Sequence, residues 1–192
     1  MLGAARALLL QVAHPLVAAG VAEHSGFAED PVGRLLPTLA TSYAIVFGDR
    51  PSAMAAVRRM DAPHRRVRGL LREPVGPFPA GTRYDATDPA LRLWVHATLV
   101  EMRLLVYDRF VACLPANARD RFYAESCEMA RALGITELMI PATSEEFRAC
   151  ISRMLSTEVA VGATARELAR LIFRPPRAAS LRVIGPWQSS SR

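Results

Sequence analysis

The sequence is poor in cysteine, and the few cysteines do not form a recognisable site. Its 192 residues include 3 cysteines, Cys113, Cys127 and Cys150, which are widely spaced and contain no C-x-x-C pair. An odd number of separated cysteines gives neither a disulfide framework nor a thiolate metal site, and packed, reduced thiols are the simpler interpretation. The cysteine pattern therefore favours a cytoplasmic protein.

Several short catalytic motifs are missing as well. The sequence has no H-E-x-x-H, no Glu-x-x-His motif repeated on two helices, no G-x-S-x-G and no glycine-rich phosphate loop. These patterns are typical of zinc proteases, di-iron carboxylate bundles, serine hydrolases and nucleotide-binding enzymes. The sequence gives no support to any of these four classes.

The sequence also lacks a long uninterrupted hydrophobic run. The most hydrophobic stretch, Met1–Ala22, is interrupted by Arg6, Gln11, His14 and Pro15. A membrane-spanning helix needs about 20 consecutive apolar residues, and a signal peptide begins with a cluster of positive charge that is missing here. We therefore expect no membrane span but a buried helix, kinked or restarted at His14-Pro15. The small residues that end this stretch resemble a signal-peptide cleavage site, so secretion remains the alternative.

Positive charge exceeds negative charge, with 24 Arg or Lys against 18 Asp or Glu and a net charge of +6. Such an excess is compatible with a nucleic acid, a membrane surface or a cofactor that carries carboxylates. The arginines are spread along the chain, however, and no helix-turn-helix with a clustered basic face is evident. We therefore expect helix surfaces covered by Arg/Glu pairs and no nucleic-acid partner, and we rank a nucleic-acid-binding regulator last.

Helix-forming sequence is what the chain has in abundance. The apolar fraction is 51%, and alanine, leucine, arginine and glutamate dominate. Asp-Pro and Thr-Ser-Glu-Glu mark helix starts, and glycine and proline mark helix ends. These signals predict helices over residues 30–47, 51–71, 90–113, 115–133, 144–155 and 163–173. Residues 72–88 are expected to be irregular, and no strand pair or repeat is evident. The length fits one all-α globular domain over residues 1–175 with a buried cofactor or ligand pocket, followed by an irregular tail over residues 176–192.

Histidine is scarce, and the candidates for a ligand are His14, His24, His64 and His96. A haem site can be made from one proximal histidine, an apolar helical pocket and a few distal polar groups. Arg65, Arg66 or Arg68, next to His64, would suit the haem propionates. Spacing alone leaves a second interpretation open, in which the histidine is simply packed in a helical protein.

Two polar pairs lie among strongly apolar residues. Arg34 and Thr38 are four positions apart, and so are His64 and Arg68, so within a helix each pair would leave the same face. Polar and cationic faces among so many core-forming residues suggest a buried cofactor.

Five motifs resemble those of a known family over roughly residues 4–175. They are the segment Ala7–Val21, Asp30-Pro-x-Gly-Arg34-Leu-x-x-Thr38, His64-x-x-Val67-Arg68-Gly69, Tyr84-x-Ala86-x-Asp88-Pro89 and Leu93–Leu99. By these motifs the chain is identified as a member of the rubber oxygenase (latex-clearing protein) and MpaB-type oxygenase catalytic-domain family.

This resemblance implies an all-α domain that binds haem b through one histidine and uses O2 to oxidise or cleave carbon–carbon double bonds in hydrophobic isoprenoid or lipid-like substrates. His64 resembles the axial ligand of the haem iron. Arg34 and Thr38 resemble the polar pair on the O2 side, which would stabilise developing charge and orient the oxygen by a hydrogen bond. Arg68 and His96 resemble further residues of the haem pocket, with Arg68 suited to pair with a propionate.

The sequence departs from the family at Pro37, where rubber-cleaving members can carry a lysine, so a lysine-closed distal site is not expected. The alternative is a protein of another class, a cofactor-free α-helical binding protein that keeps the apolar pocket and binds fatty or isoprenoid ligands. The substrate and the oligomeric state do not follow from the sequence.

Overall fold

A computed structural model describes residues 3–24 and 31–174, with the backbone alone for residues 31–36, 38 and 39. Within these residues the helices are α1 (Ala4–Ala13), α2 (Pro15–His24), α3 (Pro31–Phe47), α4 (Arg50–His64), α5 (Pro89–Phe110), α6 (Ala116–Ala132), α7 (Ser144–Thr157) and α8 (Ala163–Phe173). A 3-10 turn, Glu137–Met139, and two short strands, β1 (Arg68–Leu70) and β2 (Arg83–Asp85), complete the fold. The prediction of a single all-α domain is confirmed. The expected N-cap at Asp30 and the tail at 176–192 lie outside the described residues.

Capping side chains begin several helices where the sequence predicts a start. Asp49 and Asp88 each accept a backbone N–H from the first turn of the helix that follows, at 2.9 and 2.8 Å. Thr143 accepts the N–H of Glu146 at 3.1 Å. Each such bond satisfies one of the N–H groups that have no partner within the helix, and is worth about 1 kcal/mol.

The chain turns sharply between α1 and α2, as expected at His14-Pro15. The two helices meet at 106°, and the extended backbone of His14, with φ −81° and ψ 122°, ends α1. The carbonyl of Ala13 at this break accepts the N–H of Ala160 at 3.1 Å. In the described part of the chain no single helix is long and apolar enough to cross a membrane, although α1 and α2 together, as a bent pair, reach that length and composition.

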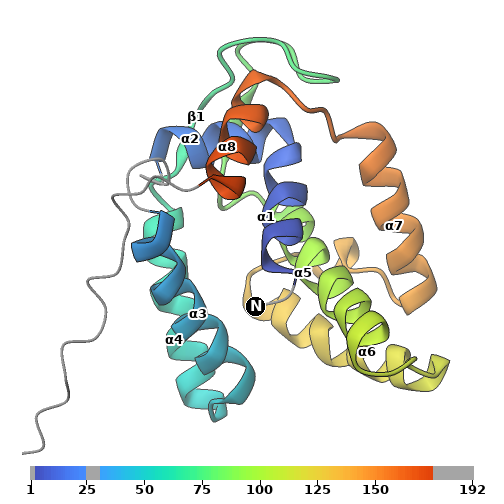
Figure 1. Ribbon diagram of the computed structural model, residues 1–192. Coiled ribbons are helices and arrows are strands. Elements are labelled where there is room, and N and C mark those ends of the chain that lie inside the picture. Colours follow the sequence, from blue (N-terminus) through green and yellow to red (C-terminus); the bar gives the residue numbers. More distant parts are fainter. Residues whose placement is uncertain (1–2, 25–30, 175–192) are drawn as a thin grey trace, which may run out of the picture.

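Helix α5 is the centre of the core. Its residues Trp94, Ala97 and Val100 are at most 1% exposed. Ala97 and Val100 pack with Tyr123 of α6 and Phe147 of α7. A second cluster joins α1 and α2 to α8, and consists of Val12, Ala18, Ala165 and Leu168. Figure 1 shows the result: α3 and α4 form a hairpin on one side of the molecule, and α6 and α7 lie on the other.

The expected helix over residues 51–71 is shorter than predicted. It ends at His64, and residues 68–70 pair antiparallel with residues 83–85. The expectation that the chain has no strand pair was therefore wrong, and His64 and Arg68 do not share a helix face. A physical reason is the buried ring of Tyr84, which lies opposite Gly69 and whose hydroxyl would overlap any Cβ at position 69. Only glycine leaves room for this close approach.

The long irregular stretch packs onto the core through its aromatic residues, as expected. Tyr84 is 3% exposed and packs with Leu16, Leu71 and Leu91, and Phe78 is partly buried against the same cluster. The ribbon β1–β2 is thereby fixed between the end of α4 and the start of α5.

Candidate active site

His64 is the last residue of α4, and its imidazole is exposed. Its Nδ1 donates a hydrogen bond to the carbonyl of Met60, one helical turn earlier, at 2.5 Å. Because a carbonyl can only accept, Nδ1 carries the proton and Nε2 keeps its lone pair. A histidine oriented in this way by a backbone carbonyl is suited to bind a metal through Nε2.

Three exposed arginines follow His64 in the chain: Arg65, Arg66 and Arg68. The Nε of Arg65 donates to Asp61 at 3.0 Å, and a guanidinium nitrogen of Arg68 donates to the carbonyl of Arg65 at 2.6 Å. The end of α4 therefore presents a histidine close in sequence to three arginines, of which Arg66 and Arg68 have no carboxylate partner in the described structure and suit the carboxylates of a ligand.

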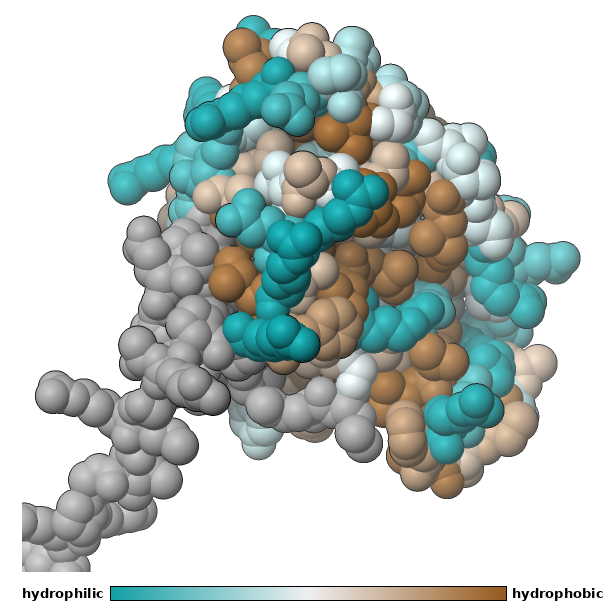
Figure 2. Space-filling view, turned by 45° about the horizontal axis from the view of Figure 1, so that its top comes forward, coloured by the Kyte–Doolittle hydropathy of each residue, from teal (hydrophilic) through white to brown (hydrophobic). Residues whose placement is uncertain are grey.

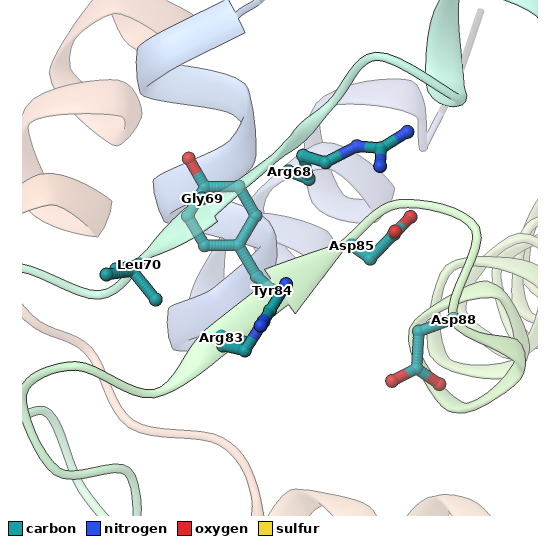
Figure 3. A pocket seen from close by; sticks show the side chains of 7 residues that line it. All are labelled: Arg68, Gly69, Leu70, Arg83, Tyr84, Asp85 and Asp88. Atoms are coloured by element: carbon teal, nitrogen blue, oxygen red, sulfur yellow. The ribbon is translucent and has the colours of Figure 1, made fainter.

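A cavity of about 440 Å³ lies at the ribbon, and it is lined by Arg68, Gly69, Leu70, Arg83, Tyr84, Asp85 and Asp88 (Figure 3). The carboxylate of Asp85 accepts the hydroxyl and the backbone N–H of Thr87, at 2.6 and 2.7 Å. These two bonds hold the pKa of Asp85 below its usual range. The lining thus combines two arginines, Arg68 and Arg83, with two carboxylates, and Arg68 and Arg83 are its groups that can donate hydrogen bonds to a ligand carboxylate.

The sequence analysis missed a polar cluster at the end of α2. The hydroxyl of Tyr84 donates to the carboxylate of Glu23, and the Nε of Arg72 donates to the same carboxylate at 2.9 Å. The Nε2 of His24 lies 3.3 Å from the Tyr84 hydroxyl. The bond from Tyr84, aided by Arg72, lowers the pKa of Glu23, while burial and the neighbouring carboxylate raise the pKa of Tyr84. The cluster holds an ionised carboxylate in place where α2 ends.

A local signal for this cluster was present in the sequence. A tyrosine in a Gly- and Pro-rich stretch that lies close to an apolar helix is expected to bury its ring, and a buried phenol needs a hydrogen-bond partner. Which acceptor it meets depends on the long-range pairing of the ribbon, so Glu23 could not be named from the sequence.

His96 lies on α5 against α6. It is 6% exposed, and burial, with the nearby charge of Arg103, lowers its pKa to about 4 although a hydrogen bond with the backbone of Ser126 opposes the shift. The structure describes both His96 and His64 and shows no contact between their imidazoles. The role of His96 in a cofactor pocket stays a prediction.

Arg34 and Thr38 both belong to α3, so the expectation that one helix carries the pair is met by the backbone. Their side chains lie outside the described part of the structure, and their placement beside O2 stays a prediction. Pro37 lies inside the same helix and is exposed.

Comparison with known proteins decides the family. Neither the curated proteins nor the solved structures gave a match. A family model described as "ER-bound oxygenase mpaB/B'/Rubber oxygenase, catalytic domain" matches residues 1–190. The chain belongs to this family. The resemblance drawn from the motifs is thereby confirmed, and the mpaB/rubber oxygenase domain is an oxygenase catalytic domain.

Within this mpaB/rubber oxygenase domain, the described residues contain no group of three or more His, Cys, Asp or Glu side chains that could hold a metal ion. His64 is exposed, and the bond from its Nδ1 leaves Nε2 available near the arginines that follow it in the chain. The donor set at the end of α4 is thus one imidazole and several guanidinium groups, which fits an iron macrocycle with acidic side chains.

Proposed function

We propose that this domain is a haem b-dependent oxygenase that uses O2 on a hydrophobic isoprenoid or lipid-like substrate. The observation that carries the proposal is the orientation of His64, whose Nδ1 is bound to the Met60 carbonyl at 2.5 Å so that Nε2 is free. Membership of an oxygenase catalytic-domain family supports the same reaction class.

The residues near the end of α4 suit two parts of a haem, the iron and the propionates. His64 supplies one nitrogen ligand, which is the usual proximal donor to haem iron. Arg66 and Arg68 are exposed cations next to it in the chain, and guanidinium groups bind carboxylates in a bidentate manner. In this proposal His64 holds the iron and the two arginines hold the propionates.

A bound haem would supply the redox-active iron at which O2 is activated for oxidation of a carbon–carbon double bond. The residues of the chain contribute binding, orientation and charge. The Met60 carbonyl fixes the proton of His64 on Nδ1 and so keeps Nε2 directed outward. Arg34 and Thr38, four positions apart on α3, would offer a cation and a hydroxyl donor to the oxygen side.

An exposed apolar surface on α3 supports a hydrophobic substrate. Tyr43, Val46 and Phe47 are 67%, 53% and 71% exposed, and the rings of Tyr43 and Phe47 lie 4.7 Å apart. Figure 2 shows hydrophobic surface exposed between hydrophilic side chains on one face of the molecule. Exposed apolar groups on the helix that carries Arg34 and Thr38 would bind an isoprenoid or acyl chain by removing its surface from water.

Absorption spectra of the purified protein after addition of haem, in the ferric and ferrous states, test the proposal. We expect a Soret band for the natural protein and a loss of haem affinity of at least tenfold for His64→Ala, because no other ligand replaces the imidazole. Added imidazole should restore the band of His64→Ala. His24→Ala is the matched control, since His24 is also an exposed last residue of a helix, and it should bind haem as the natural protein does.

Two results would contradict the proposal. A folded natural protein without a Soret band would exclude haem and favour a cofactor-free protein that binds hydrophobic ligands. A Soret band of equal intensity in all three proteins would show adventitious binding.

For the substrate class, O2 uptake should occur with an unsaturated isoprenoid chain and be absent with a saturated chain of equal length.

A further inference from the structure

Arg92 joins three elements near the candidate site. It lies on the first part of α5, and its side chain is 18% exposed. In its guanidinium group, Nη2 donates a hydrogen bond to the carboxylate of Asp61 on α4, and Nη1 donates one to the carbonyl of Leu133 at the end of α6. Its Nε donates a longer hydrogen bond, of 3.3 Å, to the carbonyl of Ala86. The rigid fork of an arginine can serve all three acceptors at once, which a lysine cannot do.

Asp61 is the acceptor through which Arg92 reaches α4. One carboxylate oxygen of Asp61 binds Arg92 and the other binds Arg65 at 3.0 Å. Burial acts against the charged carboxylate, but the bonds from Arg65 and Arg92 outweigh it and hold the pKa of Asp61 below its usual range. Asp61 is therefore ionised and lies one helical turn before His64, in the last turn of α4.

The backbone around Arg92 leaves room for this contact. Gly134 follows the end of α6 with a left-handed φ of 75°, and a Cβ at that position would lie 3.2 Å from Nη1 of Arg92. A glycine is thus favoured both by the turn that ends α6 and by the space that the guanidinium occupies.

We propose that Arg92 is the positioning residue for His64, because it holds the last turn of α4 against α5 and α6 and thereby sets where the imidazole stands. Figure 1 shows why such a link matters: α4 packs along α3 in a hairpin at one side of the molecule, while α5 lies in its centre. An ion pair with a partly buried arginine, supported by two carbonyl bonds, fixes the end of that hairpin. The inference rests on the proposed function only where it is tested on the haem-loaded protein.

The first readout needs no cofactor. Three backbone amides report on the end of α4: Arg65 N donates to Asp61 O, Arg66 N to Pro63 O and Val67 N to His64 O, at 3.2, 3.1 and 3.0 Å. In Arg92→Met these amides should exchange with solvent at least tenfold faster than in the natural protein. The amide of Phe147, bonded to Thr143 at the start of α7, serves as the internal reference for a change that is not confined to the end of α4, and its exchange should not change.

The second readout uses the haem-loaded protein. Removing a residue that orients a metal ligand typically lowers metal affinity by about 10- to 100-fold. We expect a haem affinity reduced in that range for Arg92→Met and for Asp61→Asn, together with a shift of the iron–histidine stretching band. Arg92→Lys should give an intermediate shift, since a lysine keeps the ion pair and loses the carbonyl bonds.

Arg119→Met is the matched control. Arg119 also pairs with an aspartate, Asp108, and donates to a carbonyl, that of Leu114 at 3.1 Å, but it links α5 to the start of α6, away from α4. This variant should leave the amides of residues 65–67 and the iron–histidine band unchanged.

The outcomes separate the two proposals. Unchanged exchange at residues 65–67 in Arg92→Met, or an equal increase in Arg119→Met, would overturn the role of Arg92. If the natural protein binds no haem but Arg92→Met accelerates exchange at residues 65–67 alone, the positioning of the α4 end is upheld and the haem proposal fails. If haem binds and neither readout responds to Arg92→Met, haem binding stands and the positioning role fails.

Discussion

Mild acid should destabilise this protein because two of its histidines are buried in the neutral form. His14 is 1% exposed and His96 is 6% exposed. Burial lowers the pKa of each imidazole to about 4, against 6.5 for an ordinary histidine. Asp88 opposes the shift at His14, and the bond with the Ser126 backbone opposes it at His96, but in both cases burial prevails.

The surroundings of His14 explain why its neutral form is preferred. Its Nδ1 accepts the N–H of Leu16 at 3.3 Å, so the ring proton is on Nε2, and that nitrogen lies 3.7 Å from a carboxylate oxygen of Glu158. The rings of Phe78 and Trp94 lie 5.2 and 6.2 Å away. A carboxylate at 3.7 Å is too distant for a strong charge-assisted hydrogen bond and does not offset the loss of water.

The sign and size of the effect follow from proton linkage. Because the unfolded chain binds a proton near pH 6.5 and the folded chain only near pH 4, stability is full above pH 6.5 and falls as the pH decreases toward 4. Each histidine would cost about 3 kcal/mol over the whole range, and about 2 kcal/mol between pH 7 and pH 5. Together they would remove about 4 kcal/mol by pH 5, a large part of an ordinary domain's stability of about 5–15 kcal/mol.

Carboxylates do not account for a loss in this pH range. The pKa values of Glu23, Asp61 and Asp85 are lowered in the folded protein from ordinary values of 4.5, 3.8 and 3.8. The stability that these groups contribute is present above those ordinary values and is lost only as the pH falls below them. A decline that begins near pH 6.5 would therefore belong to the histidines.

Urea unfolding followed by circular dichroism at pH 7, 6 and 5 measures this loss. His14→Gln and His96→Gln should each be less stable than the natural protein at pH 7 but should reduce the loss between pH 7 and pH 5 by about 2 kcal/mol. His24→Gln, at an exposed position, should leave the loss unchanged. A natural protein whose free energy of unfolding is equal at pH 7 and pH 5 would refute the reasoning, as would single variants with an undiminished loss.

Three further substitutions test the packing. Gly69→Ala should lower the free energy of unfolding by about 1–3 kcal/mol, because the added Cβ would overlap the Tyr84 hydroxyl. At Gly81 an added Cβ would meet no atom within 4 Å. Gly81→Ala should therefore lower the free energy of unfolding by only about 1 kcal/mol, because its backbone is left-handed. Leu168→Ala, at a position 4% exposed between α8 and the first two helices, should cost about 2–5 kcal/mol. Thermal unfolding measures all three, and a Gly69→Ala variant as stable as the natural protein would show that the Tyr84 ring is not fixed against position 69.

Local signals predicted most of the helices. Asp88-Pro89 and the Thr143-Ser144 start both mark helices that the structure contains, because an N-cap bond involves residues only two or three positions apart. The corner at His14-Pro15 was predictable for the same reason, since proline cannot donate the hydrogen bond that would continue α1.

Long-range pairing is what the sequence did not reveal. Each strand of the ribbon has 3 residues, which is too short to show an alternating pattern, and its partner lies beyond an irregular loop. The apolar residues after His64 therefore resembled a continuing helix. The ion pair between Asp61 and Arg92 and the bond between Tyr84 and Glu23 depend on the same tertiary arrangement.

The candidate site was predictable in part. The motif containing His64 indicated a ligand, and the bond from its Nδ1 to the Met60 carbonyl is a short-range feature of α4. The position of His96 was not predictable, because α5 is buried on several sides and its periodicity does not say which face meets α6 and which meets α4.

The contact of α8 with α1 and α2 bears on the order in which the protein can fold during synthesis. The corner between α1 and α2 is closed by Ala160, and the apolar faces of both helices are covered by Ala165 and Leu168 of α8. During synthesis α1 and α2 leave the ribosome before α8, which begins at Ala163 and follows at about 5–20 residues per second. The apolar faces of α1 and α2 therefore stay uncovered by α8 until residues 163–173 have been made, and the contact between these three helices can form only then.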